Sequence, residues 1–166
     1  MDTFSPASIE LTALFEDILS RGLSLRIRVT GRSMTPFLCE DETVIIRKIS
    51  ATLLRKGDLI FFKDPGGCPV IHRILRKGTS PDGALVFETK GDALTVCDEL
   101  VQDKEVLGKV CKVERGGRLL NLETRTLVAF NYFLATIGFF EARLCHVARS
   151  VLRYLRVGGK RGGGIT

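Results

Sequence analysis

The sequence predicts a mainly β protein: one antiparallel sheet, coiled or barrel-like, with a short helix before it and a helical tail after it. Three observations predict this class. Seven short segments of strand-forming residues follow one another between residues 23 and 122, Gly, Pro and Asp separate them, and helical periodicity is confined to the two ends. Hydrophobic residues make up 45% of the 166-residue chain, which suffices for one core but leaves no room for two full domains.

The first part of the chain, residues 1–22, is predicted to form a short amphipathic helix over residues 8–21. Its apolar residues recur three and four positions apart, at Leu11, Leu14, Phe15, Ile18 and Leu19. Gly22 favours the end of the helix at this point. The favoured interpretation is a helix packed on the β domain, and the alternative is a contact with a partner or a membrane.

The second part, residues 23–123, is predicted to be the β domain. Apolar and polar residues alternate over residues 23–29, which is typical of a half-buried strand. A break containing Gly31 and Pro36 follows this strand. Six further strands are expected at residues 43–49, 58–62, 70–75, 84–89, 105–113 and 118–122.

The third part, residues 124–166, is predicted to be a hydrophobic and basic helical tail. Residues 126–140 are apolar apart from Asn131 and hydroxyl groups, but fifteen residues are fewer than the roughly 20 that span a bilayer. Residues 141–157 continue with apolar positions near one helical face and arginines between them. We therefore expect a peripheral membrane contact through residues 126–157; the alternative is a helical hairpin packed on the β domain or on a second copy.

The distribution of charge argues against a nucleic-acid partner. Residues 1–123 contain 18 basic and 18 acidic residues, whereas residues 124–166 contain seven basic residues and one acid, Glu141. The tail thus carries the whole net charge of +6, and a nucleic-acid-binding domain would spread its basic residues over its own surface. The five cysteines are scattered without a CxxC pair, so neither a disulfide framework nor a metal site is expected, and no cofactor is implied.

Three motifs in the β domain carry the residue types of a serine hydrolase. Ser33 lies in the turn that follows the first strand, where backbone N–H groups can bind an oxyanion. His72 interrupts an otherwise apolar strand and supplies a base near neutral pH. Asp92 and Asp98 lie in an acidic turn, from which one carboxylate can orient the imidazole. Each motif alone is more often structural than catalytic.

Together and in order, these motifs resemble the signal peptidase I superfamily over residues 28–113. The resemblance rests on Gly-x-Ser-Met-x-Pro, Lys-Gly-Asp, Val-Ile-His-Arg-Ile, Thr-Lys-Gly-Asp with a later Asp, and Val-Leu-Gly-Lys-Val. The chain has histidine at position 72, where the bacterial branch has lysine. In this respect it resembles the endoplasmic-reticulum and archaeal branch. The resemblance implies Ser33 as nucleophile, His72 as general base, Asp98 as the third catalytic residue and Asp92 as a supporting acid.

The resemblance also implies roles for two neighbours of Ser33 and shows two departures. Met34 would shape the turn that presents the serine. Gly31 replaces a serine that contributes to the oxyanion hole in many family members, and the residues before Ser33 show no membrane-spanning pattern. The implied function is a serine endopeptidase acting on a peptide or preprotein. The alternative is a non-catalytic peptide-binding or regulatory module of the same superfamily.

Overall fold

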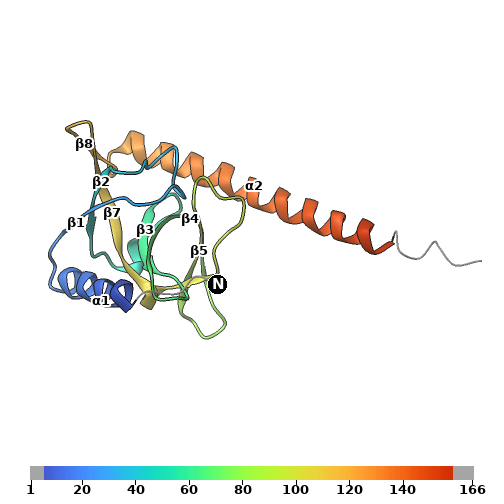
Figure 1. Cartoon of the computed structure of the whole chain (residues 1–166), viewed down its shortest axis with the longest axis horizontal. Helices are drawn as coiled ribbons and strands as arrows, with labels where there is room; N and C mark the ends of the chain where they lie inside the picture. The colour runs from blue at the N-terminus through green and yellow to red at the C-terminus, as the bar shows by residue number, and fades with distance from the viewer. Residues whose placement is uncertain (1–5, 159–166) are drawn as a thin grey trace, which may run out of the picture.

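The computed structural model describes the backbone of residues 6–158 and the side chains of residues 10–144. Helix α1 (Pro6–Ser20) precedes a mainly antiparallel sheet that curls into a half-barrel, and helix α2 (Arg125–Gly158) follows it. Figure 1 shows the two helices on opposite sides of the curled sheet. The predicted fold class, with a helical segment at each end, is confirmed.

The sheet contains eight strands in the order β1-β2-β7-β3-β4-β5-β6, with β8 paired to β7, and every pairing is antiparallel. The strands are β1 (Leu25–Arg28), β2 (Thr43–Arg47), β3 (Leu59–Lys63), β4 (Pro69–Thr79), β5 (Leu85–Lys90), β6 (Val101–Gln102), β7 (Val106–Arg115) and β8 (Arg118–Asn121). Two 3₁₀ turns, η1 (Ala51–Leu53) and η2 (Asp103–Glu105), complete the described elements.

Two hydrophobic clusters cover the two faces of the central strand β3. Phe61 packs in the cluster beneath α1, whereas Ile60 and Phe62 pack in the other cluster. This two-sided burial explains why β3 is a continuous apolar run rather than an alternating one. The favoured interpretation of α1 is confirmed, because Leu19 is buried in the first cluster and Phe15 packs against it.

Each of the seven predicted strands is present, with shifted ends. The first begins at Leu25 rather than Leu23, which is exposed, and β4 continues to Thr79 because its far half pairs with β5. The sequence analysis did not predict β6 or the two 3₁₀ turns. The hairpin alternative for the tail is wrong, because α2 is one uninterrupted helix from Arg125 to Gly158.

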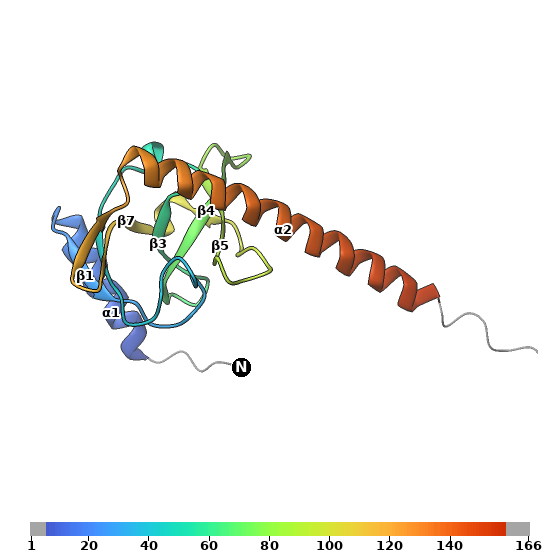
Figure 2. The same cartoon turned by 90° about the horizontal axis from the view of Figure 1, so that it is seen from above.

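Helix α2 begins on the sheet and then projects away from it. Its first turns lie across the half-barrel, and its later turns extend beyond the β domain in both views (Figures 1 and 2). Among its described side chains only Asn131, Ala135 and Gly138 are buried. The window Arg125–Leu144 is long and apolar enough to cross a membrane by length and composition, although 17% of it is buried against the domain.

Candidate active site

The turn that carries Ser33 closes the connection between β1 and β2. Two backbone hydrogen bonds join its ends: Val29 N–H to Glu42 O at 2.7 Å, and Asp41 N–H to Val29 O at 3.0 Å. Met34 is buried in the core beneath the turn, while Ser33 stays half-buried at the surface. Met34 therefore anchors the turn as expected, and it leaves the serine accessible.

His72 lies on β4 and is held by an acid from the turn after β5. The imidazole Nδ1 lies 2.6 Å from Asp98 Oδ2, and the Thr89 hydroxyl donates to the same oxygen at 2.6 Å. Because a carboxylate only accepts hydrogen bonds, Nδ1 carries the hydrogen in the neutral imidazole and Nε2 keeps its lone pair. His72 is 5% exposed, and the Phe62 ring packs edge-on against it. The ring is thus fixed, and its basic nitrogen Nε2 has no hydrogen-bond partner among the described residues.

Gly91 separates this nitrogen from the Ser33 turn. A Cβ atom on Gly91 would lie 2.6 Å from Ser33 O, closer than real side chains permit, and 3.0 Å from His72 Nε2, a tight contact. Two residues on, Ala93 N–H donates to Ser33 O at 2.9 Å. The absence of a side chain at position 91 therefore lets the backbone of Ser33 and the free imidazole nitrogen approach the same point.

Ser33 itself makes no side-chain hydrogen bond to His72 within the described residues. Catalytic hydrogen bonds of this kind often form only when the substrate is bound. The Ser33 N–H likewise donates to no acceptor in that part of the chain, and it remains available to an oxyanion. The structure thus brings Ser33, His72 and Asp98 to one location. The hydroxyl and the backbone N–H of Ser33 have no hydrogen-bond partner among the described residues.

Gly31 adopts a φ of +87°, a left-handed conformation that favours glycine. A Cβ atom at this position would contact nothing within 4 Å, so the backbone conformation alone disfavours a serine there. The backbone conformation directly after β1 therefore favours glycine over serine at position 31.

Asp92 does not face His72. Its carboxylate accepts two hydrogen bonds from Arg73, Nε to Oδ1 at 2.8 Å and Nη2 to Oδ2 at 2.6 Å. Arg73 is fully buried, and its Nη1 also donates to Gly57 O at 3.1 Å and to Asn131 Oδ1 at 2.8 Å. The resemblance implies Asp92 as a supporting acid; in the structure its carboxylate faces a buried guanidinium.

Two cavities border the candidate site and share Val70 as a wall. One, of about 340 Å³, contains Ser33 and lies between α1, β1 and the start of β4. The other, of about 550 Å³, contains His72 and Asp98. Both strand edges beside Ser33 are free of sheet partners in the described chain, because β1 ends the sheet and β4 pairs with β5 only from Arg73 onward.

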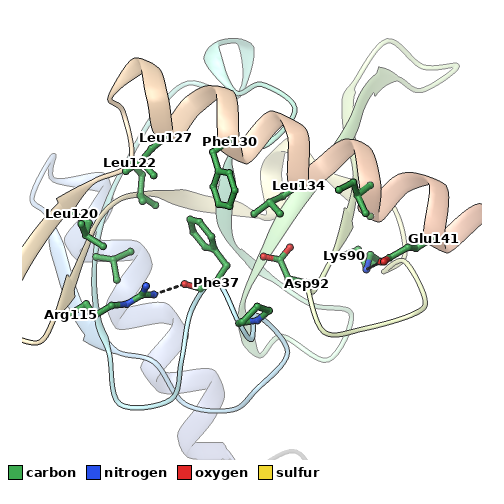
Figure 3. A pocket seen from close by; sticks show the side chains of 14 residues that line it. Phe37, Lys90, Asp92, Arg115, Leu120, Leu122, Leu127, Phe130, Leu134 and Glu141 are labelled. Carbon is green, nitrogen blue, oxygen red and sulfur yellow. Dashed lines mark hydrogen bonds and ion pairs between the residues drawn. The ribbon is translucent and has the colours of Figure 1, made fainter.

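A third cavity, of about 440 Å³, lies beneath α2 and contains none of these three residues. Figure 3 shows its mainly apolar lining, with Phe37 on one wall and Leu134 of α2 on another. Since Pro36 and Phe37 follow Ser33 in the same turn, this hollow lies behind the turn rather than at the serine.

Sequence reasoning missed four residues that shape the site: Arg73, Thr89, Gly91 and Asn131. Arg73 offered a signal, since it is a charge inside an apolar strand. Among the described side chains, no group of three His, Cys, Asp or Glu residues is placed to hold a metal ion. Searches against protein-family models and curated proteins found no match for this chain.

Proposed function

We propose that the protein is a serine endopeptidase that cleaves a peptide or preprotein bound in extended form. Ser33 is the nucleophile, His72 the general base and Asp98 the residue that orients the base. The observation that carries the proposal is the 2.6 Å bond between His72 Nδ1 and Asp98, which leaves Nε2 facing the Ser33 turn across Gly91. A histidine held in this way is suited to remove a proton from a serine hydroxyl.

The reaction follows from these positions. As Ser33 Oγ attacks the scissile carbonyl carbon, His72 Nε2 takes the hydroxyl proton, and the carbonyl oxygen becomes an oxyanion that the Ser33 N–H can bind. The imidazolium, stabilised by Asp98, then gives its proton to the leaving amine. Water attacks the resulting acyl-enzyme with His72 again as base, which releases the acid product and restores the serine.

The two free strand edges support an extended substrate. A peptide placed between β1 and the segment of β4 before Arg73 would gain backbone hydrogen bonds on either side. Alternate side chains would then point into the 340 Å³ cavity, whose lining includes Phe15, Ile27 and Ile71. This lining favours small or apolar side chains next to the scissile bond.

We further propose that α2 contacts the membrane peripherally. Asn131 supports this mode over spanning, because a helix withdrawn into the bilayer would lose its bond to the buried Arg73. Large side chains on the outward side, such as Phe133 and Phe140, are more than half exposed and available to the lipid surface. Arg149, Arg153 and Arg156, the arginines that we expect at anionic headgroups, have side chains outside the described residues.

A serine-directed acylating probe tests the enzyme proposal against the non-catalytic alternative. The wild type should be labelled at one site, and Ser33→Ala and His72→Ala should each lose labelling and peptide cleavage while keeping the wild-type circular dichroism spectrum. The double variant should be barely worse than either single one, since the two groups act as a unit. Ser50→Ala is the matched control, because Ser50 is an exposed serine outside the candidate site. Labelling that survives Ser33→Ala would contradict the assignment.

Vesicle sedimentation tests the peripheral mode. The protein should sediment with anionic vesicles and be partly released by high salt, because each basic residue near such a surface contributes about 1 kcal/mol that salt screens. Replacing Arg149, Arg153 and Arg156 with Gln should weaken sedimentation and leave cleavage of a soluble peptide unchanged. Full resistance to alkaline carbonate would indicate a spanning helix instead, and no sedimentation at all would refute the membrane contact.

A further inference from the structure

Helix α2 rests on the β domain along one narrow stripe. Its buried residues, Asn131, Ala135 and Gly138, are spaced four and three positions apart and so lie on one helical face. Cavities lie on both sides of this stripe: the 440 Å³ hollow of Figure 3 and another of about 770 Å³ beside Gly57.

The stripe covers two buried cations, Arg73 and Lys90, which are adjacent in sequence to residues of the candidate site. Arg73 and Lys90 are cross-strand partners in the pairing of β4 with β5. Arg73 follows His72 directly, and Lys90 lies between Thr89, which binds Asp98, and Gly91. A Cβ on Gly138 of α2 would lie 3.2 Å from Lys90 Cε, so helix and lysine are in close contact.

Asn131 makes the one polar contact in this stripe. Its Oδ1 accepts from Arg73 Nη1 at 2.8 Å, and both residues are buried. The helix backbone here is also tightly seated, because a Cβ on Gly57 would lie 2.8 Å from the carbonyl carbon of Asn131. Position 131 is thus fixed against the Gly57 turn while its amide is bonded to Arg73.

The contact continues from Arg73 to Ser33. Arg73 holds both carboxylate oxygens of Asp92, which follows Gly91 in the turn after β5. The next residue, Ala93, donates its N–H to Ser33 O. Every link in this sequence is a hydrogen bond of 2.9 Å or less or a peptide bond.

We propose that Asn131 is a positioning residue for the Ser33–His72 site, acting through Arg73 and Asp92 on the turn that holds Ser33. This inference rests on the proposed peptidase function and assigns the docked α2 a part in it. An apolar side chain at position 131 would leave a guanidinium N–H buried without its acceptor. Arg73 and Asp92 would then shift, and the Ser33 carbonyl would move relative to His72. Misplacement of the reacting groups lowers the rate of the chemical step more than the affinity for substrate.

Kinetics on three full-length variants test the proposal. Asn131→Leu removes the acceptor, Asn131→Asp keeps a carboxylate oxygen in its place, and Thr136→Ala is a matched change on the same helix, since that hydroxyl bonds only within the helix. On a peptide whose cleavage depends on Ser33, Asn131→Leu should lower kcat by roughly 10- to 100-fold with KM nearly unchanged. Asn131→Asp should recover most of the loss. An equal loss in Asn131→Leu and Asn131→Asp, or a change confined to KM, would overturn the proposal.

Hydrogen exchange of the Ala93 amide gives a second measurement that needs no activity. Exchange should be about tenfold faster in Asn131→Leu than in wild type and unchanged in Thr136→Ala, because the Ala93 bond to Ser33 is the last link. Wild-type exchange in folded Asn131→Leu would overturn the positioning role. If Asn131→Leu does not fold, Asn131→Ser, which is too short to reach Arg73, replaces it in both measurements. A wild type that cleaves no peptide would instead refute the proposed function, and the exchange result would still decide the role of Asn131.

Discussion

The two faces of the β4–β5 pair carry two similar contacts with different chemical capacity. On one face His72 meets Asp98, and on the other its neighbour Arg73 meets Asp92; the closest N···O distance is 2.6 Å in both. The Arg73 guanidinium has only N–H donors and no lone pair that could accept a proton from a substrate. The neutral imidazole of His72 keeps a lone pair on Nε2, so the His72 pair can take part in a proton transfer.

The two pairs also differ in how far their side chains are exposed. The Arg73 side chain is fully buried beneath α2, and Asp92 is 15% exposed and lines the hollow of Figure 3, whereas Asp98 is 22% exposed and lines another cavity together with His72. Successive residues of a strand point to opposite faces, so one step along β4 separates a rigid framework from a group that solvent and substrate can reach. The turn after β5 thus serves both faces, with Asp92 at its start and Asp98 at its end.

The largest expected effect is on activity, in Asp98→Asn. The amide no longer fixes the hydrogen on Nδ1, so kcat should fall on the order of 10³-fold, though by less than in Ser33→Ala. The free energy of unfolding should change by about 1 kcal/mol or less, since a hydrogen-bonding side chain remains. Turnover and urea unfolding of the same preparation check both parts. A stability loss larger than that of Asp92→Asn would reverse the roles of the two acids.

Asp92→Asn should show the opposite pattern. It leaves the buried Arg73 without a compensating charge, which should lower the free energy of unfolding by about 3–5 kcal/mol. Asp17→Asn is the matched control, because it breaks an Asp–Arg pair whose side chains are both more than half exposed. Such exposed pairs contribute about 1 kcal/mol or less. Equal urea midpoints for Asp92→Asn and Asp17→Asn would contradict a framework role for Asp92.

Gly91→Ala tests the close approach between the Ser33 turn and His72. The new methyl group would lie 2.6 Å from a backbone oxygen of Ser33, so the turn must move, at a cost of about 1–3 kcal/mol. Peptide cleavage should fall further than stability alone explains, because the methyl group also lies at His72 Nε2. Gly78→Ala on β4 is the control, since its methyl group would meet only the Val86 side chain, at an ordinary 3.8 Å. Similar turnover for both variants would show that Gly91 does not set the geometry.

Much of the fold could be predicted because it follows from local patterns. Alternation marked the edge strand β1, an apolar run marked the doubly buried β3, and Gly-containing turns marked their ends. The tail was harder to interpret: Glu141 and Arg143 suggested a break after residue 140, but α2 continues because both side chains are exposed, and Glu141 Oε2 lies 3.7 Å from Lys90 Nζ on β5.

The candidate site, too, could be predicted only in part. Ser33, His72 and Asp98 were selected by motif order. The pairing of β4 with β5 and the bond from Asp98 N–H to Thr89 O bring Asp98 to His72, and the bond from Ala93 N–H to Ser33 O brings in the Ser33 turn. Their catalytic roles remain predictions. The environment of Arg73 was not predictable, because its partners come from distant parts of the chain: Gly57, Asp92 and Asn131. Strand periodicity shows that a charge is buried but not which groups neutralise it.

The smallest expected effect is a thiol titration at the Asp98 end of the turn. Burial, followed by the nearby Glu88 carboxylate, raises the pKa of Cys97 to about 11 from an ordinary value of 9.0. The folded state thus holds this proton more tightly than the unfolded state, and its contribution to stability is complete below about pH 9 and is lost as the pH rises toward about 11.

Alkylation of Cys97 should therefore accelerate by about tenfold for each unit between about pH 7 and about pH 10 without levelling off, because only the thiolate reacts. Peptide mapping by mass spectrometry, with the exposed Cys39 as an internal reference, measures the rate. In Asp92→Asn the turn keeps one acceptor for Arg73 but loses the charge and the second hydrogen bond. Water should therefore reach Cys97 and its alkylation near pH 8 should speed up, whereas Asp98→Asn should keep the turn closed. Equal acceleration in the two variants would mean that both acids hold the turn, and the division between framework and reactive pair would fail at this point.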